Sequence, residues 1–421
     1  MNDTPADCCA DPSQKLLSVE QGRQRILDAV PVISDHEQLH LRAALNRVLA
    51  EPVVSTIDVP PFANSAMDGY AIRYEDCTGT SPCTLTLIGE SFAGAPYAGE
   101  VKAGQCLRIM TGAVMPAGAD TVLMQEAVER DGEQIQFDPA RVKAEQHVRH
   151  AGEDTRTGQT VLEPGKLLGP AELGLLASVG VGEIRVFRKL RVAFFSTGDE
   201  LTSIGTPLQN GQIYDSNRYA LHGLLSNAGV DFHDLGVIPD RREAVRDAFR
   251  QAATMADLVL TSGGVSVGEA DFVTETLEEL GEINFWRMAM KPGKPLAFGK
   301  LDDAVFFGLP GNPVSAMVTF YQFVLPAIRR MSGAQARDPL VFEARCTNPL
   351  KKGPGRMEFQ RGILQRSADG NWEVSTTGLQ GSHVLRSMSL ANCFILLPAE
   401  SSGVGEGDSV LVQPFSDFGV S

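Results

Sequence analysis

The chain contains 421 residues, of which 43% are hydrophobic and 21% charged, as is typical of a globular protein with roughly two to four domains. Its 37 basic and 52 acidic residues give a net charge of −15. This balance argues against a nucleic-acid partner, because affinity for phosphate backbones depends on clustered lysines and arginines. No segment approaches the roughly 18 consecutive apolar residues of a membrane helix, and the acidic start MNDTPADCCADPSQK is unlike a secretion signal. We therefore expect a cytoplasmic protein that binds neither nucleic acid nor membranes.

The seven cysteines are scattered along the chain, without a CxxC pair or the spacing of a zinc finger. We interpret them as reduced, mostly structural thiols. Two of them, Cys8 and Cys9, lie in residues 1–15, which we predict to be a disordered extension.

Two helices are predicted near the N-terminus. Ser18 and Gln21 have the spacing of a capping box, and the apolar pattern that follows them stops before Pro31. A second helical segment, 41–51, stops before Pro52.

The sequence then changes to short runs that alternate apolar and polar residues. This pattern covers residues 57–147 and folds back at Asp131-Gly132, which predicts an inserted β-rich domain. Gly-rich and helical segments resume at 148–185. We assign 16–56 and 148–185 to one N-terminal domain that the insertion interrupts.

Residues 186–335 alternate strands with helices. The predicted strands are 189–196, 230–238, 257–262, 283–290, 295–301 and 304–309. The predicted helices are 217–229, 240–254, 271–281 and 313–331. Such alternation predicts right-handed βαβ units and a central, mainly parallel sheet with helices on both faces, within a multidomain α/β protein. The last segment, 338–421, has short strands without a helical period and predicts a small all-β C-terminal domain.

Ligands of an open parallel sheet bind outside the carboxyl ends of its strands. Three loops leave predicted strands there: STGDE (196–200), TSGGVSVGEAD (261–271) and GLPGNP (308–313). Their glycines allow a close backbone approach, and a following helix N-terminus offers free amides to an anion. Each loop alone is better explained as a plain turn, but three loops at the same edge of one sheet favour a binding site.

The same loops carry acids, and a basic segment lies near them in the sequence. Glu200 and Asp271 are candidates for a hard cation such as Mg²⁺ or for substrate contacts, whereas Asp240 is equally well explained as the cap of helix 240–254. Arg287, Lys291 and Lys294 surround a Pro-Gly turn and suit an anionic ligand, the alternative being a solvated turn. In the N-terminal half, PPFANSAMDGYAIR, RIMTGAVMPAGAD and VRHAGED are polar segments for which a surface turn is an equally good explanation.

Taken together, these segments resemble one family, the molybdopterin molybdenumtransferases, which insert molybdenum in the last step of molybdenum-cofactor synthesis. The motifs that carry the resemblance stand in the family's order across almost the whole chain. They are PPFANSAMDGYAIR, RIMTGAVMPAGADTV, RHAGED, STGDEL, IYDSNRYAL, SGGVSVGEADF, KPGKPLAFG, LPGNPVSA, GRMEFQRG and GSHVLRSMSLANCF.

The resemblance implies an elongated four-part subunit that forms a homodimer. The active site would lie between the α/β domain of one subunit, of the molybdopterin-binding type, and the inserted domain of the other. Adenylylated molybdopterin and molybdate would be the substrates, AMP a product, and Mg²⁺ the required metal.

The resemblance also implies roles for individual residues. Asp68, Glu200, Asp240 and Asp271 would be catalytic, with Glu200 and Asp271 at the metal. The substrate-binding residues would be Thr111, Arg149, Asp154, Ser216, Gly263, Gly264, Ser266, Lys291, Lys294, Pro310 and Pro313. Lys291 and Lys294 would hold phosphate or molybdate, and the two prolines would shape the loop on the pterin side.

Three alternatives stay open at this point. Molybdopterin adenylyltransferase, the preceding enzyme, resembles the α/β domain but usually consists of little more than that domain. Related domains in animals serve as scaffolds for membrane receptors. Tungsten transfer would share the motifs, because tungstate and molybdate have nearly the same size and charge. Transient contact with the adenylyltransferase or with a molybdoenzyme chaperone is a further hypothesis.

Overall fold

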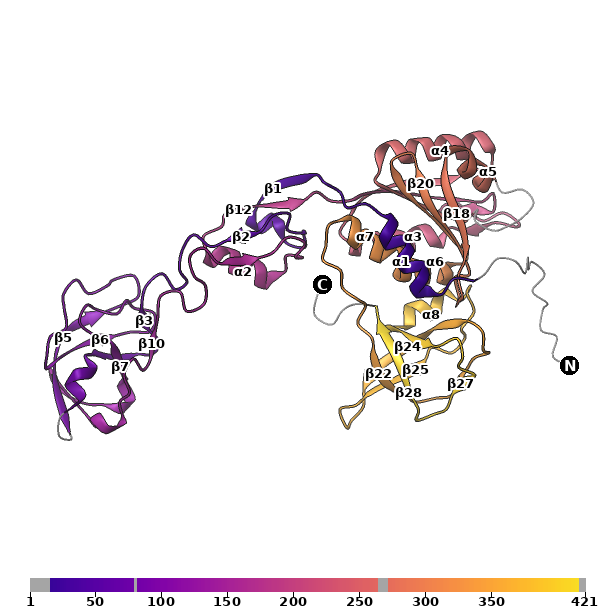
Figure 1. The fold of residues 1–421 in the computed structure, drawn as a ribbon. Coiled ribbons are helices and arrows are strands. Elements are labelled where there is room, and N and C mark those ends of the chain that lie inside the picture. The colour runs from indigo at the N-terminus through magenta and orange to yellow at the C-terminus, as the bar shows by residue number, and fades with distance from the viewer. Residues whose placement is uncertain (1–15, 79–81, 264–271, 416–421) are drawn as a thin grey trace.

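The computed structural model describes residues 16–78, 82–263 and 272–415. These form an elongated molecule, with the inserted domain at one end and the α/β and C-terminal domains together at the other (Figure 1). The predicted extension with Cys8 and Cys9 lies outside the described residues. Within the described ranges, no helix is long and apolar enough to cross a membrane.

The first helix, α1 (Val19–Ala29), begins with the predicted capping box. The Gln21 amide donates to the Ser18 hydroxyl at 3.1 Å, and the Ser18 amide donates to the Gln21 side chain at 3.2 Å. However, α1 packs on the α/β domain, where Ile26 shares a buried cluster with Phe323, which differs from the predicted placement of this segment in the N-terminal domain.

The prediction of a second helix at 41–51 is wrong. The segment contains only a 3₁₀ turn, η1 (Leu41–Ala44), and then runs irregularly through Asn46, which has a φ of 61°. The amides of Asn46 and Leu49 donate to the carbonyls of Leu168 and Lys166, so the chain bonds to a distant segment instead of to itself.

The N-terminal unit is built from short paired strands under one helix. β1 (His36–His40) pairs antiparallel with β12 (Glu183–Phe187), and β2 (Val53–Val54) with β11 (Thr160–Leu162). Helix α2 (Pro170–Ser178) contributes Leu176 to their core.

The inserted domain is a six-stranded sheet of order β7-β4-β6-β5-β9-β8. Its strands are β4 (Gly69–Ile72), β5 (Cys83–Ser91), β6 (Gln105–Ile109), β7 (Thr121–Met124), β8 (Glu129–Asp131) and β9 (Gln134–Phe137). The Asp131-Gly132 hairpin is confirmed, with Gly132 at a φ of 61°. β3 (Asn64–Ser65) pairs with β10 (Val148–Arg149) where the chain enters and leaves the domain. Three 3₁₀ turns complete it: η2 (Tyr74–Thr78), η3 (Gln125–Ala127) and η4 (Pro139–Arg141).

The α/β domain holds a six-stranded sheet of order β16-β13-β17-β21-β20-β18. β16 (Asp231–Ile238), β13 (Arg191–Thr197), β17 (Leu258–Ser262) and β21 (Ala304–Leu309) are parallel neighbours. β20 (Pro295–Leu301) is antiparallel to β21 and to β18 (Gly281–Arg287). The short β14 (Leu201–Thr202) and β15 (Ile213–Tyr214) pair beside it.

Helices cover both faces of this sheet. Phe194, with α3 (Ser216–Asn227) and the continuous helix of α6 (Pro313–Thr319), π turn η5 (Phe320–Val324) and α7 (Leu325–Met331), belongs to one buried cluster. Its neighbour Phe195, on the opposite face, packs with α4 (Arg242–Met255) and α5 (Phe272–Leu280). This alternation follows from the two-residue period of a strand.

The C-terminal domain is a barrel-like sheet that closes through the pairing of β24 with β26. Its strands are β22 (Phe342–Cys346), β24 (Met357–Arg366), β25 (Trp372–Thr376), β26 (Cys393–Leu397) and β28 (Ser409–Pro414), with β23 (Leu350–Lys351) paired to β27 (Gly403–Val404). β19 (Met290–Lys291), from the α/β domain, joins its edge. The expectation of an all-β tail is wrong in one place, because α8 (Leu385–Leu390) is helical; six residues are too few to show a helical period in sequence.

Candidate functional site

Three predicted loops do start from one edge of the α/β sheet. β13, β17 and β21 are adjacent, and their carboxyl ends are in register: Ser196, one residue before the end of β13, pairs with Ser262, and Ser262 pairs with Leu309. The loops at 196–200 and 308–313, and the first residues of the loop at 261–271, therefore leave side by side. The structure thus confirms that these strand ends meet.

Several buried polar atoms at this edge have no hydrogen-bond partner within the described part of the chain. They are the hydroxyls of Ser196, Thr197 and Thr261, Asp215 Oδ2 and Asn217 Oδ1. Ser196, Thr261 and Asp215 are at most 3% exposed. Buried polar groups are normally hydrogen-bonded, so this row of unsatisfied atoms marks a place where a polar ligand or ordered water belongs.

Asn217 connects two of the strand ends at this edge through hydrogen bonds. Its side-chain amide donates at 2.7 Å both to the Ser262 hydroxyl, at the end of β17, and to the Gly311 carbonyl, in the loop after β21. The predicted residue Ser216 is the first residue of α3, whose cap is Asp215. Sequence reasoning missed Asp215 and Asn217 as site residues, although both lie in the IYDSNRYAL motif.

Gly263 allows the strand end to turn tightly. Its φ is +93°, and a Cβ at this position would lie 2.8 Å from the Thr197 carbonyl oxygen. Its amide donates to the Leu309 carbonyl at 3.2 Å. Only glycine fits this combination without strain. Gly264, Ser266 and Asp271 lie outside the described residues.

Three carboxylates gather at the same edge. The Asp240 amide donates to Asp199 Oδ1 at 3.1 Å. Burial, followed by the negative charges of Asp199 and Glu200, raises the pKa of Asp240. The capping alternative for Asp240 is wrong, because α4 has Arg241 at its N-cap and no side-chain cap bond. The Asp240 side chain therefore does not cap α4, and it lies close to Glu200.

The basic segment lies where the α/β and C-terminal domains meet. The Lys291 ammonium is 2.8 Å from a carboxylate oxygen of the buried Glu358, and its own side chain is 55% exposed. Lys294 is half-buried, and its carbonyl accepts from the Met288 amide. Pro310 is buried, and Pro313 begins α6.

A second group of predicted residues lies in and beside the inserted domain. Asp68 Oδ1 accepts hydrogen bonds of 2.7 Å from both the amide and the hydroxyl of Thr111. These bonds, the amide bond first, lower the pKa of the exposed Asp68. Arg149 lies in β10, and the Asp154 amide donates to the Val59 carbonyl. Within one chain, this group lies far from the α/β edge (Figure 1).

The cysteines are free thiols wherever they are described. Burial raises the pKa of Cys106 and of Cys393 to about 12, so both thiols stay protonated and unreactive at neutral pH.

The fold and the edge site together define a multidomain α/β protein with a ligand-binding α/β domain, an extended N-terminal unit and a barrel-like C-terminal domain. Residues 17–180 match the MoeA N-terminal region (domains I and II), residues 193–330 a probable molybdopterin binding domain, and residues 343–415 the MoeA C-terminal region (domain IV). The chain belongs to the molybdopterin molybdenumtransferase family.

Similar proteins cover nearly the full length. A molybdopterin molybdenumtransferase of Haemophilus influenzae is 46% identical, over 95% of this chain and 99% of its own. One from a Nostoc species is 37% identical, over 95% of this chain and 94% of its own. The crystal structure of a molybdopterin biosynthesis moeA protein from Pyrococcus horikoshii OT3 superposes with a TM-score of 0.83 at 31% identity, covering 95% of this chain and 100% of that one.

Proposed function

We propose that this protein is an enzyme that transfers molybdenum from molybdate to the dithiolene sulfurs of adenylylated molybdopterin and releases AMP. The supporting observation is the row of buried, unpartnered polar groups along the carboxyl edge of the α/β sheet, in a chain that matches this family from residue 17 to residue 415. A substrate rich in phosphate and pterin polar atoms would satisfy those groups.

Mg²⁺ fits the chemistry of the acidic side chains at this edge, because hard cations prefer carboxylate oxygens. Burial first, and then the negative charges of Asp199 and Glu200, raise the pKa of Asp240, and a cation would relieve the repulsion between these charges. Within the described residues, no three acidic, thiol or imidazole side chains are placed around one point. We assign the ion to Glu200 and Asp271, where it would offset charge that develops on phosphate oxygens. Chelation by EDTA should abolish AMP release and added Mg²⁺ restore it; release that is insensitive to EDTA contradicts this assignment.

The remaining roles follow from position. Attack of a water oxygen at one of the two phosphorus atoms forms a new P–O bond and breaks the P–O bond to the bridging oxygen, so that AMP and the molybdopterin phosphate separate. Asp240 and Glu200 lie where they can orient that nucleophile. Lys291 and Lys294 supply positive charge to phosphate or molybdate. We assign Gly264 and Ser266 to binding of the same anions, and Gly263, whose amide donates to the Leu309 carbonyl, to the turn that leads into this loop. Pro310 and Pro313 shape the pterin-side loop beside Ser216.

The inserted domain acts on the partner subunit of a homodimer. Asp68, Thr111, Arg149 and Asp154 cannot reach the α/β edge of their own chain at the separation seen in Figure 1. A second copy would bring them to its site. Transient contact with a molybdopterin adenylyltransferase or a molybdoenzyme chaperone, in the cytoplasm, completes the proposal.

The deciding experiment measures AMP release from adenylylated molybdopterin with Mg²⁺, with and without molybdate, for the wild type and Asp271→Ala. Release that needs molybdate and is lost in the variant supports the proposal. Formation of the adenylate from ATP and molybdopterin would instead identify an adenylyltransferase. No product in either assay would favour a scaffold. Equal rates of AMP release with tungstate and molybdate would show that the protein does not discriminate between the two metals.

A further inference from the structure

The chain crosses twice between the α/β domain and the N-terminal unit. One crossing runs from α1 to β1, and the other from β12 to β13. We call residues 36–187, which hold the N-terminal unit and the inserted domain, the arm, and the α/β and C-terminal domains with α1 the body.

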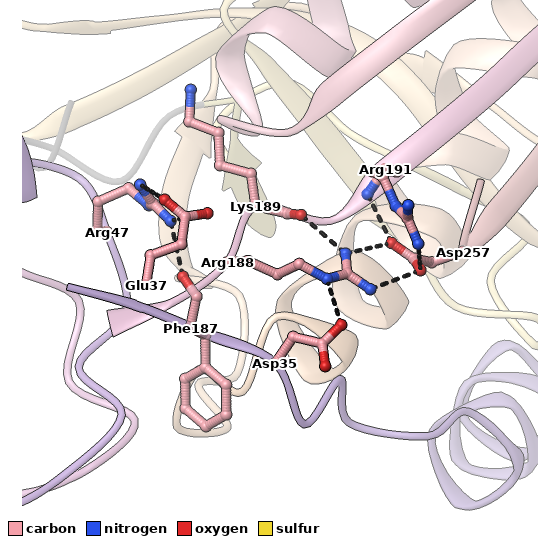
Figure 2. Close-up of polar contacts among 8 residues, drawn as sticks. All are labelled: Asp35, Glu37, Arg47, Phe187, Arg188, Lys189, Arg191 and Asp257. Carbon is pink, nitrogen blue, oxygen red and sulfur yellow. Dashed lines mark hydrogen bonds and ion pairs between the residues drawn. The ribbon is translucent and has the colours of Figure 1, made fainter. Parts of the chain in front are cut away.

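One arginine bonds to both crossings and to the body (Figure 2). Arg188, on the second crossing, donates through Nη1 and Nη2 to the two carboxylate oxygens of Asp257 at 2.7 and 2.8 Å. Its Nε donates to Asp35, on the first crossing, at 2.8 Å. The Arg188 and Asp257 side chains are only 18% and 14% exposed. A bidentate, largely buried pair of this kind fixes direction as well as distance.

Asp257 is itself anchored in the sheet. Its amide donates to the Arg191 carbonyl, and its own carbonyl accepts from the Val305 amide, both at 2.9 Å. The Arg191 amide also donates to its carboxylate at 2.8 Å. Burial opposes ionisation here, yet the bonds from Arg188 and Arg191 lower the pKa of Asp257 to about 2. The carboxylate is therefore charged throughout the physiological pH range.

The rest of this junction combines one packed contact with a cavity, because Phe187 of the arm packs against the buried cluster of the body and against Gly333. A cavity of about 300 Å³ lies between arm residues such as Leu167 and body residues such as Ala228 and Ile328. Beyond the cavity, the Gln335 amide donates to the Gly165 carbonyl at 2.9 Å. Close packing fixes the relative positions of elements. Where the cavity replaces such packing, the direction of the arm also depends on the polar contacts on either side of the cavity.

We infer that Arg188 is a positioning residue for the proposed reaction: by joining both crossings to Asp257, it fixes the direction of the arm and so the placement of Asp68 and Thr111. This inference rests on the proposed function, in which those two residues act on the partner's site. Both belong to the inserted domain, which forms the outer part of the arm (Figure 1), so a small rotation at the junction becomes a larger displacement of that domain.

The test compares Arg188→Met with a matched control, Arg185→Met. Arg185 lies three residues earlier and pairs with Glu51 within the arm, where both side chains are about half exposed. Spin labels are attached to non-natural residues at positions 134, in the arm, and 250, in the body. Excess unlabelled protein ensures that each dimer carries one labelled subunit. Pulsed electron resonance then measures the distance between the two labels. AMP release gives kcat and KM on the same samples.

Arg188→Met should broaden the distance distribution and lower kcat roughly 10- to 100-fold with KM little changed, because misplacement costs rate more than binding to the body. Arg185→Met should match the wild type, and Arg188→Lys should be intermediate. Asp35→Ala, which removes only the bond from Arg188 Nε, should broaden the distribution if Arg188→Met does not fold.

A wild-type-like distance distribution in the variants overturns the inference, and so does a broad one with normal kcat. If the wild type releases no AMP, the proposed function fails instead, while the distances still decide whether Arg188 holds the arm.

Discussion

Asp68 is an exposed carboxylate that the structure holds in one orientation. The Thr111 amide and hydroxyl both donate to the same oxygen, which keeps the group ionised and leaves its second oxygen for a substrate or a partner group. An exposed residue held this way, on a turn, serves recognition or chemistry more readily than stability.

Asp68→Asn keeps the shape and the acceptor oxygen but removes the charge. We expect AMP release to fall by about 100-fold, the usual size of the loss of one group that stabilises a transition state, with an unchanged melting temperature. Thr111→Ser, which retains both donors to Asp68, is the control and should stay near the wild-type rate. A melting temperature that drops with the rate would assign Asp68 a structural role.

Gly263 is the other position where one residue decides the site. Gly263→Ala would meet the Thr197 carbonyl and would require an unfavourable φ, so we expect a loss of about 1–3 kcal/mol in urea unfolding together with lost activity. Gly205→Ala separates the cost of the steric clash from the cost of the backbone angle. Gly205 has a φ of +88°, but no atom lies within 4 Å of an added Cβ. Equal losses in both variants would mean that only the backbone angle matters.

At the scale of elements, the long helix 313–331 shows what holds α1 on the body. Pro326 has no amide to donate to the carbonyl of Gln322, four residues earlier, and the helix widens into the π turn just before it. Arg23 of α1 donates to that carbonyl at 3.1 Å and to the Gln322 side chain at 2.7 Å. Arg23 therefore donates to a carbonyl that has no amide donor four residues later in its own helix.

Arg23→Met should leave the Gln322 carbonyl unsatisfied, at a cost of about 1–3 kcal/mol. We expect hydrogen exchange in α1 to accelerate about tenfold or more as the helix opens from the body. Arg25→Met, at an exposed position of the same helix, is the matched control. Exchange rates that rise equally in both variants would show that helix propensity, and not the contact with Gln322, is responsible.

The same element shows what sequence patterns reveal and what they miss. The capping box at Ser18 and the strands that meet at Ser196 could be predicted, because local spacing and periodic patterns in the sequence specify them. The docking of α1 on Gln322, and the pairing of Asn46 with Leu168 in place of a helix, depend on residues more than 100 positions away. The buried hydroxyls of Ser196 and Thr261 read in sequence as ordinary strand residues, because their lack of partners exists only once the sheet is assembled.

At the scale of the molecule, the main feature is the separation of two groups of site residues. Glu200 and Asp240 lie in the α/β domain, and Asp68 and Thr111 lie at the other end of the elongated chain (Figure 1). A twofold dimer allows a site built from both groups, since each subunit then supplies one half of two equivalent sites. A monomeric enzyme would leave one group without a role.

Mixing inactive subunits tests this arrangement. Asp68→Asn and Glu200→Gln homodimers should each be inactive, but a heterodimer of the two has one site with both groups intact, so random exchange should restore about a quarter of the wild-type activity. Asp68→Asn mixed with Thr111→Val is the control, because both changes fall in the inserted domain and every site stays defective. If exchange is verified by mass spectrometry and the first mixture still shows no recovery, both groups act within one subunit and the arm must fold back on its own body. Recovery in the control as well would show that the gain in activity does not come from sites shared between subunits.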